Sequence, residues 1–239
     1  MLRYSANGNS FVVFNLLEKS LSDEEKEKLV LENVGDEDGV LFVERKNHLF
    51  SMDYFNRDGK RAKFCGNGSR AFLKYLFDEG YIKEGKVDFW SYAGLLRGIV
   101  KNDKVSVAMP EITLFQKTSF DNYEGHLVVV GVPHFVVQVE NVEEFDVEKI
   151  GRYLRQLSDA NVNFFEEVSR GYLKIRTYER GVERETKACG SGATATFAVY
   201  REKTGVSEAI LQAPGGQLRL YLSDGKIFLE GSVERCSEG

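Results

Sequence analysis

Two cysteines of the chain begin the same short pattern, Cys-Gly-x-Gly, and each pattern opens a stretch with helical spacing. The patterns are CGNG at Cys65 and CGSG at Cys189. A cysteine just before a helix lies beside backbone N–H groups that lack intrahelical partners, and beside the positive end of the helix dipole. Both features favour a thiolate over a thiol. The two patterns therefore predict two reactive thiols.

Helix ends of this kind also bind anions, because glycine lets a carboxylate or phosphate approach the N–H groups closely. If one carboxylate met both helix ends, the two thiols would flank the carbon atom next to it. A thiolate could then remove a proton from one face of that carbon, and a thiol could return one to the other face. Two thiolates so close would repel, so we expect the pair to share one proton. The predicted chemistry is inversion of a stereocentre.

A duplication of the chain would supply two such helix ends. Cys65 and Cys189 are 124 residues apart (189 − 65), and Arg97 and Arg219, each after a leucine, are 122 apart (219 − 97). Two unrelated landmarks thus share nearly one offset. We predict an α/β chain of the α+β type with two similar halves, each a curved, largely antiparallel sheet wrapped around a central helix.

The expected halves are residues 1–111 and 112–239, with the active site in the cleft between them and residues 231–239 returning toward the first half. No parallel alternation of strands and helices is evident in the pattern, so a doubly wound sheet is disfavoured. Ser22 and Glu25 form a capping box that begins a helix ending at Gly35. The cysteine helices are expected to end at Gly80 and Gly205, with three strands after each, and further strands are predicted over 11–15, 39–45, 49–55 and 171–178.

Composition excludes several classes of partner. The net charge is −5 and no segment gathers basic residues, which argues against nucleic acid or an anionic membrane. The longest apolar stretch, residues 127–139, is interrupted by polar residues and is shorter than the roughly 18 residues of a membrane span. The N-terminus lacks the apolar core of a signal peptide, so we expect a cytoplasmic protein.

The remaining ligand-type residues predict neither a metal site nor a disulfide framework. Three cysteines form no CxxC pair, and the three histidines His48, His126 and His134 supply no close-spaced zinc ligands. The expected state is free thiols in a reducing compartment. We expect no cofactor, a small-molecule amino-acid substrate as the binding partner, and a homodimer as one oligomeric state.

Motifs around these cysteines resemble those of the diaminopimelate epimerase family in the same order, from about residue 5 to 230. The run ERG followed by ACGSGA is specific, and CGNG lies upstream of it in the right order. The other matching motifs are GNSF with Asn9, FNRDG with Asn56, CGNGSRAF, Pro133-His134, DANVNF with Asn161, and Pro214-Gly215-Gly216.

The resemblance implies an isomerase that converts L,L-diaminopimelate to the meso form without pyridoxal phosphate, in lysine and cell-wall precursor synthesis. It assigns the catalytic roles to Cys65 and Cys189, and a supporting role to His134 beside a cysteine. The residues that it implies for the anion cradle are Gly66, Asn67, Gly190 and Ser191. The residues that it implies for the substrate's amino groups and distal carboxylate are Asn9, Asn56, Asn161, Glu179 and Arg180.

The chain departs from the family pattern at Val132, Gly39 and Ser10, where the family usually has Asn, Gln and Asp. None of these positions is a cysteine or its glycine, so the departures concern recognition of the substrate's distal end. Alternatives are therefore a racemase or epimerase of proline, hydroxyproline or another diamino acid, or an isomerase of the phenazine type. A further alternative is an amino-acid-binding module without turnover, which would need neither thiol.

Simpler interpretations exist for each motif alone. Each glycine motif also reads as GxGxxA, a dinucleotide-binding pattern, but cysteine has no role there and strands in a hairpin-like order follow. The two cysteines could be buried thiols or form a disulfide. The asparagines are typical of turns, Glu179-Arg180 of a solvated pair, and His134 of a strand start. Cys236, in a polar tail, is assigned no role.

Overall fold

The computed structural model describes residues 1–236, and these divide into two compact units. Unit 1 is Met1–Ala108 together with the described residues from Glu230 onward, and unit 2 is Met109–Leu229. The boundary expected from the duplication lies after residue 111, and the contacts within the chain divide the units after Ala108.

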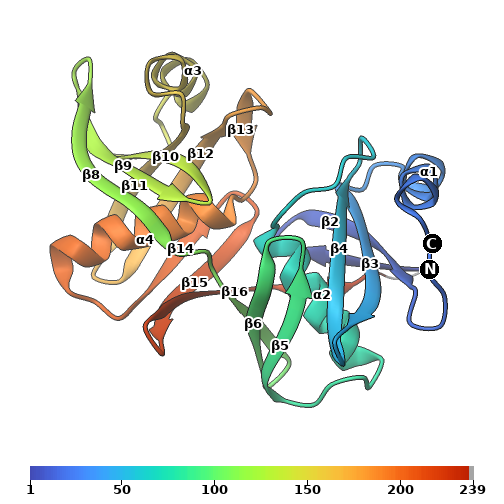
Figure 1. The fold of residues 1–239 in the computed structure, drawn as a ribbon. Helices are drawn as coiled ribbons and strands as arrows, with labels where there is room; N and C mark the ends of the chain where they lie inside the picture. Colours follow the sequence, from blue (N-terminus) through green and yellow to red (C-terminus); the bar gives the residue numbers. More distant parts are fainter. Residues whose placement is uncertain (237–239) are drawn as a thin grey trace. The chain divides into compact units, whose positions relative to one another are not determined.

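Unit 1 is a curved sheet whose order follows from its pairings (Figure 1). Its strands pair in the order β17-β1-β2-β3-β4-β5-β6-β7. The pairs β2–β3 and β4–β5 are parallel and the others are antiparallel. The bounds are β1 Leu2–Ala6, β2 Asn9–Asn15, β3 Gly39–Lys46, β4 Leu49–Asn56, β5 Gly85–Ser91, β6 Gly94–Lys101, β7 Lys104–Ala108 and β17 Val233–Arg235.

Unit 2 repeats this pattern in the order β8-β9-β10-β11-β12-β14-β15, with β10–β11 and β12–β14 as its parallel pairs. A short strand, β13, forms a hairpin with the end of β12. Strand β16 (Lys226–Gly231) carries the chain across the boundary between the units. The other bounds are β8 Ile112–Phe120, β9 Tyr123–Val130, β10 Val132–Gln138, β11 Asn161–Ser169, β12 Tyr172–Glu179, β13 Arg184–Thr186, β14 Glu208–Ala213 and β15 Gly216–Ser223.

A cysteine-capped helix packs against the sheet of each unit. In unit 1, helix α2 (Gly66–Asp78) is buried from its first residue to Leu76 and contacts β1, β2, β3, β6, β7 and β17. In unit 2, helix α4 (Gly190–Thr204) contacts β9, β10, β11 and β15 and ends at Gly205 in the left-handed conformation. The apolar side chains of each central helix form the core that the sheet encloses.

A second helix in each unit packs against a separate apolar cluster. Helix α1 (Asp23–Asn33) begins with the predicted capping box, in which Ser22 accepts from the Glu25 amide and Glu25 accepts from the Ser22 amide. Its Val30 packs with Val40 and Phe42. Helix α3 (Val147–Ser158) covers a cluster that contains Val147, Leu154, Phe164 and Tyr178.

The fold class is confirmed: the chain mixes helices with largely antiparallel sheet in two similar halves. The expectation that parallel strand–helix–strand units are absent is wrong, because α1 and α2 connect parallel strands in unit 1 and α3 and α4 do so in unit 2. Local periodicity identifies a strand but not its neighbour in the sheet, and each parallel partner lies beyond a helix.

Two smaller differences concern element bounds. Helix α1 ends at Asn33 with Val34 as its C-cap, so Gly35 lies outside it. Helix α3 and strands β8 to β11 received no assignment from the sequence, because the apolar residues of β9 and β10 form one nearly continuous run. Among residues 1–236, no helix has the length and apolar character needed to cross a membrane.

The contact between α3 and β12 generates a stability prediction. A Cβ atom added at Gly151 would lie 2.5 Å from the Cβ of Tyr178. We expect Gly151→Ala to lower the free energy of unfolding by about 1–3 kcal/mol through overpacking. In an unhindered helix the same substitution would instead raise the free energy of unfolding by about 1 kcal/mol, because alanine has the higher helix propensity. Urea unfolding measures the change.

The control for this prediction is Gln156→Ala on the exposed side of the same helix, which we expect to change stability by less than about 0.5 kcal/mol. A Gly151→Ala protein as stable as the wild type would contradict the close packing of α3 on Tyr178.

Candidate active site

The two cysteines are the N-cap residues of the two central helices. The Cys65 Sγ accepts a hydrogen bond from the Gly68 amide at 3.2 Å, and the Cys189 Sγ accepts one from the Gly192 amide at 3.4 Å. Their backbone angles are similar, with φ −145° and ψ 112° at Cys65 and φ −126° and ψ 108° at Cys189. Sulfur thus occupies the place that a serine or aspartate oxygen usually takes at a helix start. Neither cysteine forms a disulfide, and both are half-buried.

The last glycine of each pattern packs closely against this cap. A Cβ on Gly68 would lie 3.4 Å from the Cys65 Sγ, and one on Gly192 would lie 3.3 Å from the Cys189 Sγ. The Gly192 Cβ would also overlap the Asn163 side chain. Glycine at position 192 thus lets Asn163 of the adjacent strand approach the first turn. At Gly68 the nearest atoms to an added Cβ are the Cys65 Cβ and the Leu41 Cδ2, both at 3.3 Å, so the packing there is tight.

The intrahelical hydrogen-bond ladder begins beyond the two amides that follow each cysteine. The Ser69 amide donates to the Cys65 carbonyl at 2.8 Å, and the Ala193 amide donates to the Cys189 carbonyl at 2.9 Å. The amides of Gly66, Asn67, Gly190 and Ser191 therefore lie outside that ladder. These are the four positions at which the sequence predicted an anion cradle.

A buried polar network lies behind Cys189. The Asn163 Nδ2 atom donates to the Nδ1 atom of His134 at 3.1 Å, and the Thr177 hydroxyl donates to the Asn163 Oδ1 atom at 2.9 Å. All three side chains are buried. Burial, together with the positive charge of Arg180, lowers the pKa of His134 to about 3. His134 is therefore a neutral hydrogen-bonding group at neutral pH.

Around Cys65 the corresponding strand positions carry different residues. In unit 2, His134 pairs with Asn161 and Asn163 pairs with Thr177. The equivalent pairs in unit 1 are Phe11 with Gly39 and Leu41 with Tyr54. The Tyr54 hydroxyl is hydrogen-bonded to Cys65. Each cysteine therefore has its own set of neighbours within one shared backbone pattern.

The predicted residues Asn9 and Asn67 lie together in unit 1. The Asn67 Nδ2 atom donates to the Asn9 Oδ1 atom, and the Asn67 Oδ1 atom accepts from Arg70. Arg70 is fully buried and also donates to Asn7 at 2.8 Å. Burial lowers the pKa of Arg70 to about 10, against the opposing effect of the Cys65 and Glu230 charges. The Asn67 side chain is thus held by its neighbours, while its amide stays at the helix start.

In unit 2, Asn161 connects two segments that carry predicted residues. Its Nδ2 atom donates to the Pro133 carbonyl at 3.0 Å, and its Oδ1 atom accepts from the Arg180 amide at 2.9 Å. The Arg180 guanidinium donates to the Asp159 carbonyl at 2.7 Å, so this cation is anchored at the end of α3. Burial raises the pKa of Glu179.

The two remaining predicted residues lie near helix or strand ends. The Ser191 hydroxyl oxygen lies 3.5 Å from the Cys189 Sγ atom. Asn56 ends β4 opposite Gly39, and its amide and carbonyl close the following turn with Lys60 and Gly59.

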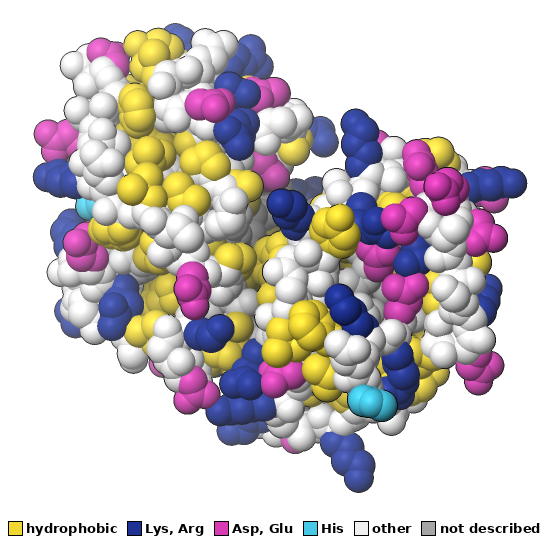
Figure 2. All heavy atoms as spheres, in the orientation of Figure 1, with side chains coloured by type: hydrophobic (Ala, Val, Ile, Leu, Met, Phe, Trp, Pro, Cys, Tyr) yellow, Lys and Arg dark blue, Asp and Glu magenta, His cyan; other side chains and the backbone are white. Residues whose placement is uncertain are grey.

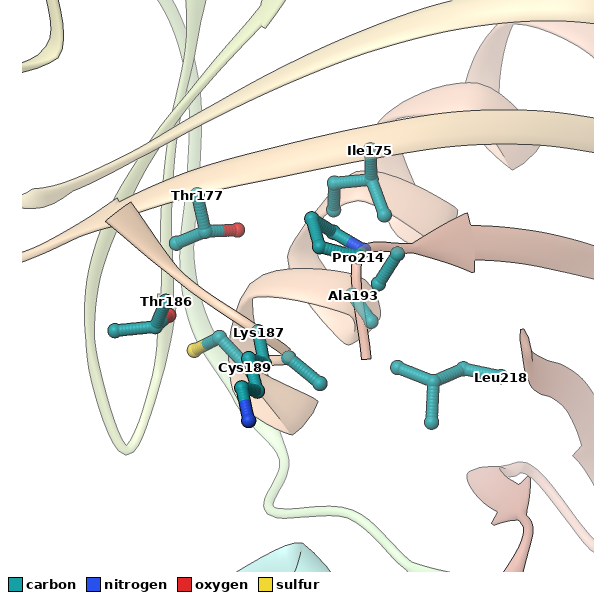
Figure 3. A pocket seen from close by; sticks show the side chains of 10 residues that line it. Ile175, Thr177, Thr186, Lys187, Cys189, Ala193, Pro214 and Leu218 are labelled. Atoms are coloured by element: carbon teal, nitrogen blue, oxygen red, sulfur yellow. The ribbon is translucent and has the colours of Figure 1, made fainter. Parts of the chain in front are cut away.

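A small pocket opens beside Cys189 within unit 2 (Figure 3). The sulfur of Cys189 points toward the side of the pocket where Thr177 and Thr186 lie, and away from Leu218. The thiol thus lies at the polar end of a pocket whose other end is apolar.

No sequence motif indicated Tyr54, Asn163 or Thr177 as site residues. Each lies two residues from a predicted site residue on the same strand: Asn56, Asn161 and Glu179, respectively. Residues two apart on a strand share one face, so the alternation of side chains along each strand could have indicated these three residues. Arg70 lay inside the quoted CGNGSRAF motif, but nothing in the sequence indicated its burial.

The burial of His134 generates a pH prediction. Its pKa is about 3 in the folded chain against an ordinary 6.5, so between these values the unfolded chain binds a proton that the folded chain excludes. This contribution to stability is complete above pH 6.5 and falls as the pH is lowered toward 3. At pH 5 the loss amounts to about 2 kcal/mol. Urea unfolding at pH 7.5 and 5 measures it.

The comparison variant is His134→Gln, which keeps an acceptor for Asn163 but does not titrate. We expect its loss of stability between the two pH values to be smaller than that of the wild type by about 2 kcal/mol. Equal losses, or an NMR titration of His134 with a midpoint above pH 5, would show that the folded chain accepts this proton.

Comparison with known proteins identifies the family. The family model for diaminopimelate epimerase matches residues 1–114 and 126–235. The diaminopimelate epimerase of Thermotoga maritima is 54% identical over 235 residues, which cover 98% of this chain and 99% of that protein. The diaminopimelate epimerase of Aquifex aeolicus is 35% identical over 268 residues, which cover 99% of this chain and 95% of that protein.

Solved structures share the fold at low sequence identity. A hydroxyproline epimerase from Agrobacterium vitis, with bound trans-4-hydroxy-L-proline, has a TM-score of 0.72 at 17% identity and matches 99% of this chain and 90% of its own. A putative phenazine biosynthesis PhzC/PhzF protein from Clostridium difficile has a TM-score of 0.81 at 16% identity, covering 100% and 97%. The motif resemblance is confirmed by the family model and the 54% identical relative: the chain belongs to the diaminopimelate epimerase family.

Proposed function

We propose that this protein interconverts L,L- and meso-diaminopimelate by acid/base chemistry between Cys65 and Cys189, without a cofactor. The observation that carries the proposal is the matched pair of helix-capping thiols, in which each sulfur accepts a hydrogen bond from a glycine amide. The 54% identity to a diaminopimelate epimerase over nearly the whole chain supports the substrate. The reaction belongs to lysine biosynthesis, as the relatives' name implies.

The chemistry requires the two sulfurs to reach opposite faces of one α-carbon. One thiolate takes the α-proton and becomes a thiol, and the electron pair of the C–H bond stays on the substrate. The opposite thiol then gives its proton to the other face and becomes a thiolate. The stereocentre is inverted, and the cysteines have exchanged protonation states, so the reverse reaction uses the same pair.

The negative charge that develops on the substrate spreads into its carboxylate. We assign its stabilisation to the amides of Gly66, Asn67, Gly190 and Ser191, which lie outside the helix ladders. Amides fixed at a helix start need no reorganisation when charge grows, which is the main advantage of such sites. Neutral His134 and its partner Asn163 hold the strands beside Cys189 without adding a charge.

Diaminopimelate carries a second ammonium and a second carboxylate at its far end. We assign the carboxylate to the Arg180 guanidinium, which suits a planar acceptor and is held by Asp159. Glu179 supplies a carboxylate for an ammonium, since a positive ligand would offset the burial that raises its pKa. Asn9, Asn56 and Asn161 remain our candidates for further polar contacts.

The departures from the family pattern bear on this far end. Val132 begins β10 and is 42% exposed, at the position equivalent to Asn9 in β2. It contributes packing surface but no side-chain hydrogen bond. Proline and hydroxyproline lack a second ammonium and carboxylate, so they would leave Glu179 and Arg180 without ligand partners. This difference favours the diamino acid.

Surface charge fits a small-molecule substrate. On the face shown in Figure 2, lysine and arginine side chains are interspersed with aspartate and glutamate, without the basic stripe that nucleic acid requires. Because the mechanism needs free thiols, we expect the protein to work in the reducing cytoplasm. A homodimer stays a prediction, which light scattering tests.

Isotope exchange tests the reaction. In heavy water, we expect the inverted product to carry one deuterium at its α-carbon, while unreacted L,L-diaminopimelate stays unlabelled at early times. This asymmetry follows because the proton removed and the proton returned belong to different groups. Mass spectrometry of the separated isomers measures it, with proline and hydroxyproline as parallel substrates. Exchange only with a proline would replace the proposed substrate, and binding without exchange would favour a binding module.

Single substitutions test the two thiols. We expect Cys65→Ala and Cys189→Ala each to lower kcat/KM for epimerisation by about 10²- to 10⁴-fold, the range for loss of a general acid or base. Cys236→Ala is the matched control, because Cys236 follows β17, where its amide donates to the Arg3 carbonyl at 2.9 Å, and has no role in the proposed chemistry. If either active-site variant kept wild-type turnover, the two-base mechanism would be wrong.

A further inference from the structure

Tyr54 is enclosed by neighbours from β2 and β3 on one face of unit 1's sheet. It lies on β4 opposite Leu41, is 6% exposed, and packs edge-to-face on Phe11 with ring centroids 5.9 Å apart. Its ring occupies the space above Gly39, where an added Cβ would lie 2.7 Å from the Tyr54 Cε2 atom and 3.1 Å from its hydroxyl oxygen. The same Cβ would meet the Phe55 carbonyl oxygen still more closely, so a larger residue at position 39 would displace both the ring and the β4 backbone.

The ring position directs the Tyr54 hydroxyl to Cys65. Burial and the negative charges of Cys65 and Asp38 raise the pKa of Tyr54, so the phenol keeps its proton at any working pH. The hydrogen bond to the Cys65 sulfur is therefore donated by the O–H group. The same sulfur accepts from the Gly68 amide at 3.2 Å. A thiolate gains more than a thiol from two such donors, because charge-assisted hydrogen bonds are stronger than neutral ones.

The equivalent hydroxyl in unit 2 has another partner. Thr177 occupies the strand position that corresponds to Tyr54, and its hydroxyl donates to the Asn163 Oδ1 atom at 2.9 Å. A hydroxyl has one hydrogen to donate, so Thr177 gives none to a cysteine. At equivalent positions of the two halves, the Tyr54 hydroxyl therefore donates to Cys65, whereas the Thr177 hydroxyl donates to the Asn163 side chain beside Cys189.

We propose that Tyr54 is a positioning residue for Cys65, which stabilises the Cys65 thiolate and fixes its side chain at the start of α2, and that Gly39 provides the space for it. The inference rests on the proposed function, in which Cys65 is one of the two acid/base groups. It assigns a role to one of the positions where the chain departs from its family pattern, because Gly39 and Tyr54 act as a matched pair.

Alkylation of a single cysteine tests this role without turnover. In a Cys189→Ala/Cys236→Ala background, the rate of Cys65 reaction with iodoacetamide is followed against pH. We expect Tyr54→Phe, which removes only the hydroxyl, to move the midpoint upward by about one pH unit, as loss of one hydrogen bond to a charged group implies. Replacement of the tyrosines by 3-fluorotyrosine, a stronger donor of the same shape, should move it downward.

Two controls separate this effect from a general loss of structure. Tyr75→Phe removes another buried hydroxyl, on the helix that Cys65 caps, where it accepts from Asn15 at 3.0 Å; it should leave the midpoint unchanged. In a Cys65→Ala/Cys236→Ala background, Tyr54→Phe should not alter Cys189 alkylation. If neither Tyr54→Phe nor 3-fluorotyrosine changes the Cys65 midpoint from its value in the unmodified background, the proposal is overturned.

The readout also distinguishes this inference from the proposed function. If the midpoint shifts but diaminopimelate shows no α-hydrogen exchange, the positioning role stands and the substrate assignment fails. If exchange occurs and the midpoint does not shift, the reverse holds. In the protein with all cysteines present, we expect Tyr54→Phe to lower kcat by about tenfold at neutral pH with little change in KM, the result of losing an interaction that affects the reacting group rather than binding.

Discussion

The hydrogen bond from a glycine amide to a cysteine sulfur, made once at the start of each central helix, is the constraint on which the site depends. It fixes the sulfur at the positive end of the helix and places it beside amides that the helix itself does not use. It also explains the surrounding sequence. A Cβ on the last glycine of either pattern would lie against the sulfur, and at Gly192 it would also overlap the Asn163 side chain.

Because each helix packs in the centre of its sheet, the strands beside it decide the environment of its thiol. The same backbone positions carry Asn163 and Thr177 near Cys189, but Leu41 and Tyr54 near Cys65. One thiol is thus set against a buried polar network with a neutral histidine, and the other against a phenol and an aliphatic side chain. A symmetric backbone supports two acid/base groups with different hydrogen-bond partners.

The duplication can be followed through residues that have no chemistry in common. The equivalent strand pairs and the two cysteines keep an offset of 122 to 124 residues (134 − 11, 161 − 39, 177 − 54 and 189 − 65). Such constancy requires each half to preserve its loop lengths, so that the strand register and the helix start stay together. The offset of the cysteines and of Arg97 and Arg219 was visible in the sequence, and the register of the strands extends it to the site.

The sequence by itself determined the two helix starts, their thiols, the capping box of α1 and the family, because each depends on residue types at short spacing. Its motifs also predicted Asn9, Asn67 and Arg180 as substrate-binding residues. The pairing of β2 with β3 and of β4 with β5, the burial of Arg70 and the neutral state of His134 were decided only in the tertiary structure. Strand partners and burial depend on residues far away in the chain, and local periodicity carries no record of them. The contact of Tyr54 with Cys65 is of the same kind: it needs the absence of a side chain at Gly39, which is a neighbour only once the sheet has formed.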